Sequence, residues 1–206
     1  MKLIENLDLV AKYLSVGKKM KDFVPIGFLG GLIGTIAMDL SNLMFKKTGL
    51  SEKTYAQYAG SILMRPFRLF FKENQILGQL LHIITGSIVG IPLFAILKKT
   101  GKDNHLFKGA VYGTFTWELL YSFGLRYGVF RTKAYSTRTH FTTLIDNLVY
   151  GFASTTTMLF LSDRSVFPKG SDKHLETNIE SEMSKESDAR IKESIYNYED
   201  EVVRIH

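Results

Sequence analysis

The sequence contains no cysteine. This absence excludes disulfide bonds, thiolate metal sites and cysteine nucleophiles. Three common catalytic signatures are also missing: Gly-x-Ser-x-Gly, His-Glu-x-x-His and a phosphate-binding loop. No motif therefore predicts a hydrolase, and the informative pattern is the arrangement of charged and apolar residues.

Charge is nearly absent from four long stretches, each 17 to 24 residues in length. A helix needs roughly 20 mainly apolar residues to cross about 30 Å of hydrocarbon. The charges lie between the stretches, whereas helices of a soluble bundle carry them along a solvated face. We therefore predict an all-α integral membrane protein. The stretches are 23–45 with Asp39, 74–97 with no charge, 109–125 with Glu118, and 139–162 with Asp146.

The predicted fold is an antiparallel four-helix membrane bundle over residues 24–162. Its spans are predicted at about 24–45, 76–97, 107–126 and 140–162. Apolar residues at helical spacing predict an amphipathic surface helix within residues 1–23, with a loosely ordered terminus as the alternative. Residues 163–206 hold 11 acidic and 7 basic residues, which predicts a charged soluble tail, disordered or partly helical.

Four spans place both termini on one side of the membrane. Lys and Arg number 12 on that side and 10 on the other, so the positive-inside rule favours cytoplasmic termini. We expect a multi-pass protein of the cell (inner) membrane.

The connection over residues 46–75 mixes basic and aromatic side chains in a way that fits the lipid headgroup layer. Its position between two spans argues against nucleic-acid binding. The predicted interface residues are Arg65, Phe67, Arg68, Phe70, Phe71 and Lys72.

Glycines recur at short spacing in the first three spans. Small residues let helices approach closely in lipid, so we interpret these glycines as packing residues. The same faces offer a route to a homo-oligomer. The glycines are Gly27, Gly30, Gly31, Gly34, Gly86, Gly90, Gly109 and Gly113.

Every predicted span carries a polar side chain that is costly in lipid. A charge at the bilayer centre costs at least about 2.5 kcal/mol, so these groups are expected to face inward. At 100° per residue they fall on polar stripes that converge on one buried cluster. The candidate ligand- or ion-binding residues are Asp39, Gln79, His82, Glu118, Tyr121, Asp146, Asn147 and Tyr150.

The preferred function is binding or conduction of a proton, cation or small polar solute by this cluster, without catalysis. Hydrogen-bonding between helices is the structural alternative. A metalloprotein or enzyme is another, with a divalent metal on His82, Glu118 and Asp146, although no Glu-x-x-His motif for a di-iron site occurs in the spans. A further alternative is a scaffold whose tail recruits a soluble partner.

Four segments carry a family resemblance: GFLGGLIGTIAMD, HIITGSIVGIPLFAIL, KGAVYGTFTWELLY and DNLVYG. Together they resemble small uncharacterised bacterial inner-membrane proteins of the YagU-like kind, over residues 24–160. The resemblance implies a bacterial type of integral membrane protein. It assigns no catalytic residue.

Overall fold

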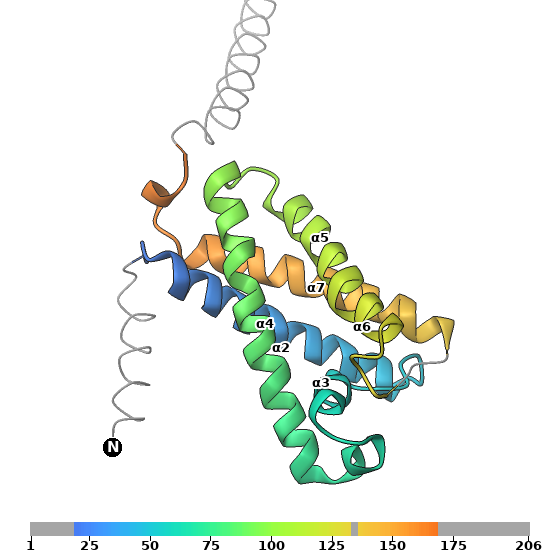
Figure 1. Cartoon of the computed structure of the whole chain (residues 1–206). Helices are drawn as coiled ribbons and strands as arrows, with labels where there is room; N and C mark the ends of the chain where they lie inside the picture. Colours follow the sequence, from blue (N-terminus) through green and yellow to red (C-terminus); the bar gives the residue numbers. More distant parts are fainter. Residues whose placement is uncertain (1–18, 133–135, 169–206) are drawn as a thin grey trace, which may run out of the picture. The chain divides into compact units, whose positions relative to one another are not determined.

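The computed structural model describes residues 19–132 and 136–168, and every regular element in these ranges is helical (Figure 1). The predicted amphipathic helix and most of the predicted tail lie outside them. The elements are α2 (Phe23–Lys47), α3 (Tyr55–Leu63), η1 (Pro66–Phe70), α4 (Lys72–Thr100), α5 (His105–Thr116), η2 (Trp117–Ser122), α6 (Phe123–Arg126), α7 (Thr137–Leu161) and η3 (Arg164–Val166).

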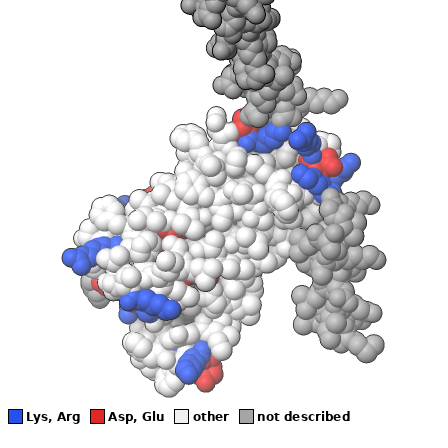
Figure 2. Space-filling view, turned by 180° about the vertical axis from the view of Figure 1, so that it is seen from behind, with Lys and Arg blue, Asp and Glu red and all other residues white. Residues whose placement is uncertain are grey.

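Among the described residues, three helices are long and apolar enough to cross a membrane: α2, α4 and α7. They have 25, 29 and 25 residues, and at about 1.5 Å per residue each exceeds the hydrocarbon thickness. Large apolar side chains such as Leu40, Ile88 and Phe160 are exposed on them. On the face in Figure 2, basic side chains gather towards the ends of the helical unit, and the surface between them is mostly uncharged. The predicted first, second and fourth apolar helices are confirmed.

The predicted third span differs from these three. Helix α5 has 12 residues and continues through η2, a π-helical turn, into α6. The wider turn is closed by the Phe123 N–H, which donates to the carbonyl of Glu118 five residues earlier. The segment is therefore helical from 105 to 126, but it is not one regular α-helix, and a four-helix membrane bundle remains a proposal.

Helix α2 packs through two glycine faces. Gly27 and Gly31 lie against the backbone of α4 at Gly90, whereas Gly30 and Gly34 lie against α7 at Ser154. A Cβ at Gly31 would come within 2.6 Å of the Gly86 carbonyl oxygen and 2.9 Å of the Gly90 Cα. The helices can approach this closely only without side chains, as expected for association in lipid.

The glycines of α5 serve the same purpose against α7. Gly109 lies against Gly151, and Gly113 against the Asn147 carbonyl. The glycine faces of α2, α4 and α5 are thus occupied by contacts within the chain. A homo-oligomer remains a prediction, but it would have to use other surfaces.

Helix α3 lies inside the long connection that the sequence analysis assigned only to the membrane interface. A capping box begins it: the Gln57 N–H donates to the Thr54 hydroxyl, and the Thr54 N–H donates to the Gln57 side chain at 3.1 Å. Helix α3 packs against α4. The six predicted interface residues that follow it are all exposed.

The chain entering α2 and the chain leaving α7 are joined. The Met20 N–H donates to the Leu161 carbonyl at 2.8 Å, and the Asp163 N–H donates to the Met20 carbonyl at 2.9 Å. Phe167 is buried and packs edge-on against Phe94 of α4. Residues 163–168, which we had included in the soluble tail, therefore pack with the helices.

Candidate functional site

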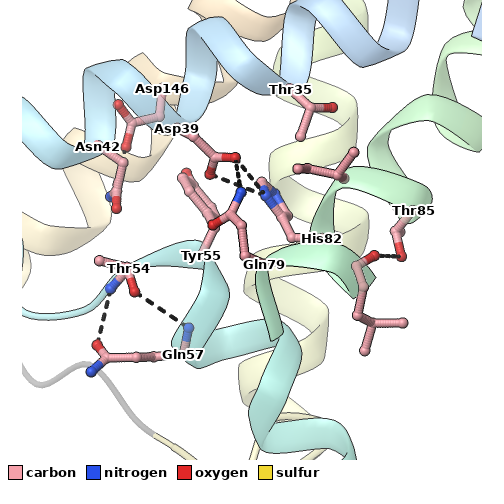
Figure 3. A network of polar contacts seen from close by, with 12 residues as sticks. Thr35, Asp39, Asn42, Thr54, Tyr55, Gln57, Gln79, His82, Thr85 and Asp146 are labelled. Carbon is pink, nitrogen blue, oxygen red and sulfur yellow. Dashed lines mark hydrogen bonds and ion pairs between the residues drawn. The ribbon is translucent and has the colours of Figure 1, made fainter. Parts of the chain in front are cut away.

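A polar cluster joins α2 to α4 (Figure 3). The Asp39 carboxylate accepts hydrogen bonds from Gln79 Nε2 at 2.5 Å and lies 3.1 Å from His82 Nδ1. Gln79 and His82 stand three residues apart, on one face of α4, so both reach the same carboxylate. The Asp39 and His82 side chains are each only 15% exposed. This short-range pairing provides the compensation that an ionisable group in a membrane span requires.

Tyr55 of α3 covers one face of the His82 ring. The two rings stack with centroids 4.8 Å apart and planes 6° apart. The Tyr55 hydroxyl donates to the Thr143 carbonyl of α7 at 3.3 Å. Burial, followed by the charge of Asp146, raises the pKa of Tyr55 well above its usual range, so the phenol remains neutral. The imidazole is thus held by a carboxylate at its edge and a neutral ring on its face.

Asp146 of α7 forms a second polar network beside the first (Figure 3). Its side chain is fully buried and accepts a hydrogen bond from Asn42 Nδ2 at 3.1 Å. Asn42 also lies 3.4 Å from the Ser51 hydroxyl. The other Asp146 oxygen, Oδ1, has no hydrogen-bond partner among the described residues. The two carboxylates therefore have different hydrogen-bond partners: Asp39 pairs with Gln79 and His82, and Asp146 pairs with Asn42.

A cavity of about 280 Å³ adjoins the His82 ring. It is bounded by α3, α4, the π-helical turn and α6, where α4 makes few contacts with α5. Three predicted site residues line it together with His82. These are Tyr121, Asn147 and Tyr150.

A second cavity, of about 380 Å³, lies on the other side of the pair. It is lined by Asp39 and Gln79 and reaches Lys72 at the start of α4. Because His82 lines the first cavity and Asp39 lines the second, the hydrogen-bonded pair connects the two.

Glu118 does not join the cluster. Its side chain is exposed, and so is that of Thr114, one helical turn earlier. The reason lies in the packing of α5, which turns Gly109 and Gly113 towards α7. Glu118 follows Gly113 by five residues, or about 140° around the helix. The glycine face, rather than the polar stripe, sets the orientation of this helix.

The predicted metal set of His82, Glu118 and Asp146 is not assembled. Within residues 19–132 and 136–168, no three His, Asp or Glu side chains are placed to hold a metal ion. His82 is paired with Asp39 and Asp146 with Asn42, on separate partners. The described residues therefore give the metalloprotein alternative no support.

Sequence reasoning missed the aromatic residues of α3. Tyr55 stacks on His82, and Tyr58 meets Tyr121 edge-on at 5.3 Å. The sequence does contain a pattern that predicts this helix, because Thr54 and Gln57 have the spacing of a capping box. Residues three apart on that helix share a face, which places both tyrosines towards the site.

The elements described so far define a helical protein with three candidate membrane spans and a polar pair between two of them. The chain belongs to the Family of unknown function (DUF6789), whose model matches residues 21–168. The match runs from the residues before α2 through η3. No curated protein and no solved structure matches the chain. The family match does not support the YagU-like resemblance.

Proposed function

We propose that this is a membrane protein with four spans whose Asp39–His82 pair takes up and releases protons. The observation that carries the proposal is the pair itself: a carboxylate and an imidazole in contact at 3.1 Å, between two long apolar helices, with a cavity on each side. Ionisable residues inside membrane spans are costly and by default functional.

The four-span arrangement follows from where the three long helices begin and end. The start of α7 lies beside the end of α2, because the Glu52 N–H donates to the Thr139 hydroxyl at 3.1 Å. The end of α4 lies beside the start of α2, because Phe94 packs against Phe23 with ring centroids 5.8 Å apart. If α2, α4 and α7 all cross the bilayer, the segment 105–126 has to return the chain between its two sides. At about 1.5 Å per residue a segment of this length spans the hydrocarbon.

Proton exchange suits the chemistry of the pair. Histidine is the side chain whose ordinary pKa lies closest to neutral pH, and each of its two ring nitrogens can exchange a proton. Nδ1 faces Asp39, so Nε2 is the other exchange position. A proton arriving through the cavity at Asp39 and Gln79 can pass to His82, whose ring borders the cavity on the other side.

The test is proton flux in proteoliposomes that hold the full chain and a trapped pH-sensitive dye, with the membrane potential clamped. We expect flux above that of protein-free vesicles, and a loss of at least about tenfold in Asp39→Asn and in His82→Gln. The matched control is His105→Gln, which changes the histidine at the start of α5, outside both cavity linings, and should keep the wild-type rate.

Two results would overturn the proposal. One is a wild-type rate equal to that of empty vesicles. The other is unchanged flux in both variants of the pair, provided that their thermal unfolding shows them folded.

The number of spans has its own test, which uses the natural lack of cysteine. A single cysteine placed at Lys102, in the α4–α5 connection, should react with a membrane-impermeant maleimide added to one side only. A cysteine at Arg131, which is exposed after α6, should react only from the other side. Labelling of both from the same side would exclude a crossing by segment 105–126.

A further inference from the structure

The cavity beside His82 has buried donors without acceptors. The hydroxyls of Tyr58 and Tyr121 are both buried and lie near each other, but neither meets hydrogen-bond geometry with the other or with any other described residue. Both residues line the cavity, and their side chains are only 2% and 4% exposed. An unpaired buried hydroxyl destabilises the fold, because it has lost its hydrogen bonds to water without a replacement. Two of them on one cavity wall indicate a site whose acceptor is supplied by a ligand.

Several aromatic rings line this cavity. Besides the two tyrosines, the rings of Tyr55, Phe123 and Phe130 line it. A cavity of about 150 Å³ is known to hold one benzene, so about 280 Å³ suits a small fused ring system. Flat aromatic walls favour a planar occupant, because rings stack or meet edge-on.

The rim indicates entry from the lipid side. Apolar side chains that line the cavity and are also exposed include Ile62, Leu119 and Phe123. They belong to α3, the π-helical turn and α6, so an apolar molecule could enter from the bilayer along the face where α4 and α6 diverge.

The lining also sets the charge of the occupant. Among the described residues it includes no Lys, Arg, Asp or Glu, and its one histidine is already paired with Asp39. A charged ligand would therefore be buried without a counter-charge, which is expensive. Burial, followed by the neighbouring Tyr121, raises the pKa of Tyr58 well above its usual range, so this phenol stays protonated and can act as a donor.

We infer that the cavity binds a neutral, planar, ring-bearing molecule whose carbonyl oxygen accepts hydrogen bonds from the hydroxyls of Tyr58 and Tyr121. Ligands of the quinone or aryl-ketone class have this chemistry. The inference goes beyond the proposed function, because it requires no change in the protonation of Asp39 or His82.

The chain contains a single tryptophan, which provides a reporter. Trp117 stacks on Tyr121 with ring centroids 6.3 Å apart, so a quinone in the cavity should quench its fluorescence. The probe is 2-methyl-1,4-naphthoquinone, titrated into the full chain in detergent. It cannot form thiol adducts, because the chain has no cysteine. Tryptophan octyl ester in the same detergent gives the non-saturable background.

We expect saturable quenching by the wild type, and a dissociation constant raised about three- to tenfold by Tyr58→Phe and by Tyr121→Phe, the loss of one hydrogen bond each. Both substitutions keep the ring and remove an unpaired hydroxyl, so the ligand-free variants should melt no lower than the wild type. The control is Tyr112→Phe, because Tyr112 does not line the cavity and its hydroxyl already donates to the Val89 carbonyl at 2.7 Å. It should leave quinone affinity unchanged.

A second ligand separates the hydrogen bonds from the apolar contacts. 2-Methylnaphthalene has the same rings without carbonyl groups and should compete with the quinone, with equal affinity for the wild type and the Tyr58→Phe variant. Absence of saturable quenching in the wild type would overturn the inference. Quenching with wild-type affinity in both phenylalanine variants would overturn the assignment of the two hydroxyls. Neither measurement depends on proton flux.

Discussion

The two halves of the helical unit are held together by different means. Where α2 begins, it contacts α4 and α7 through glycines, backbone against backbone. Towards the end of α2 the contact with α4 passes instead through the side chains of Asp39 and His82, with α3 packed beside them and a cavity on either side. A polar site needs room for side chains, and close glycine packing removes that room. A site can therefore form in the half that contains Asp39 and His82, where α2 and α4 meet through side chains.

The largest effect is expected in the glycine half, where no space is left. Gly31→Val would bring a Cβ within 2.9 Å of the Gly90 Cα and the Ser87 carbonyl oxygen, which are backbone atoms that cannot rotate away. We expect a loss of about 3 kcal/mol or more, measured as the free energy of unfolding in detergent. Ile36→Val, on an exposed position of the same helix, should cost less than about 1 kcal/mol. Equal losses in both variants would show that the contact at Gly31 is no tighter than an exposed position of the same helix.

The next effect concerns the polar half. His82→Leu leaves the Asp39 carboxylate without its imidazole partner, and we expect a loss of about 3 kcal/mol. Adding Asp39→Leu removes the stranded charge and should recover most of that loss, because apolar replacements of a buried pair are often neutral. The measurement is a double-mutant cycle of unfolding free energies. Strict additivity would mean that the two side chains do not interact, and the pair could not be the centre of the site.

The smallest effect concerns α3, the short helix that packs against α4. Thr54→Ala removes half of the capping box of α3 and should cost about 1 kcal/mol. The Thr54→Ser variant keeps the hydroxyl, so its loss of unfolding free energy in the same assay should be only a few tenths of the loss in Thr54→Ala. Because the helix positions Tyr55 against His82, Thr54→Ala should also lower proton flux. A variant that loses stability but keeps full flux would separate α3 from the site.

Much of the helical layout could be predicted from the sequence. Three of the four long apolar stretches correspond to single long helices, and α2, α4 and α7 lie where they were expected. The broken helix over 105–126 could not be foreseen, because a π-helical turn depends on packing rather than on a residue pattern. The contact of Phe167 with Phe94 was missed for a similar reason: a short apolar segment next to a charged tail has no periodicity to mark it.

The site was predictable in part. Asp39, Gln79 and His82 were expected to converge, and the structure brings them together. Whether they bind a ligand or a proton remains a prediction. Glu118 was placed wrongly in a buried cluster, because a polar stripe was weighed above the glycine face of the same helix. Tyr55 and Tyr58 were missed because they lie in the connection between two predicted spans, and the polar stripes were sought only within the spans.

The π-helical turn has a consequence for the history of the family. Such a turn is an α-helix with one residue added, and here it lies between Gly113, which packs on α7, and Gly124, which packs on Phe130. A relative without the added residue would carry a straight helix, and the side chains after it would be rotated by about 100°. Tyr121 would then leave the cavity wall. In an alignment, a one-residue gap between these two glycines would divide the family into members that inherited this cavity and members that did not.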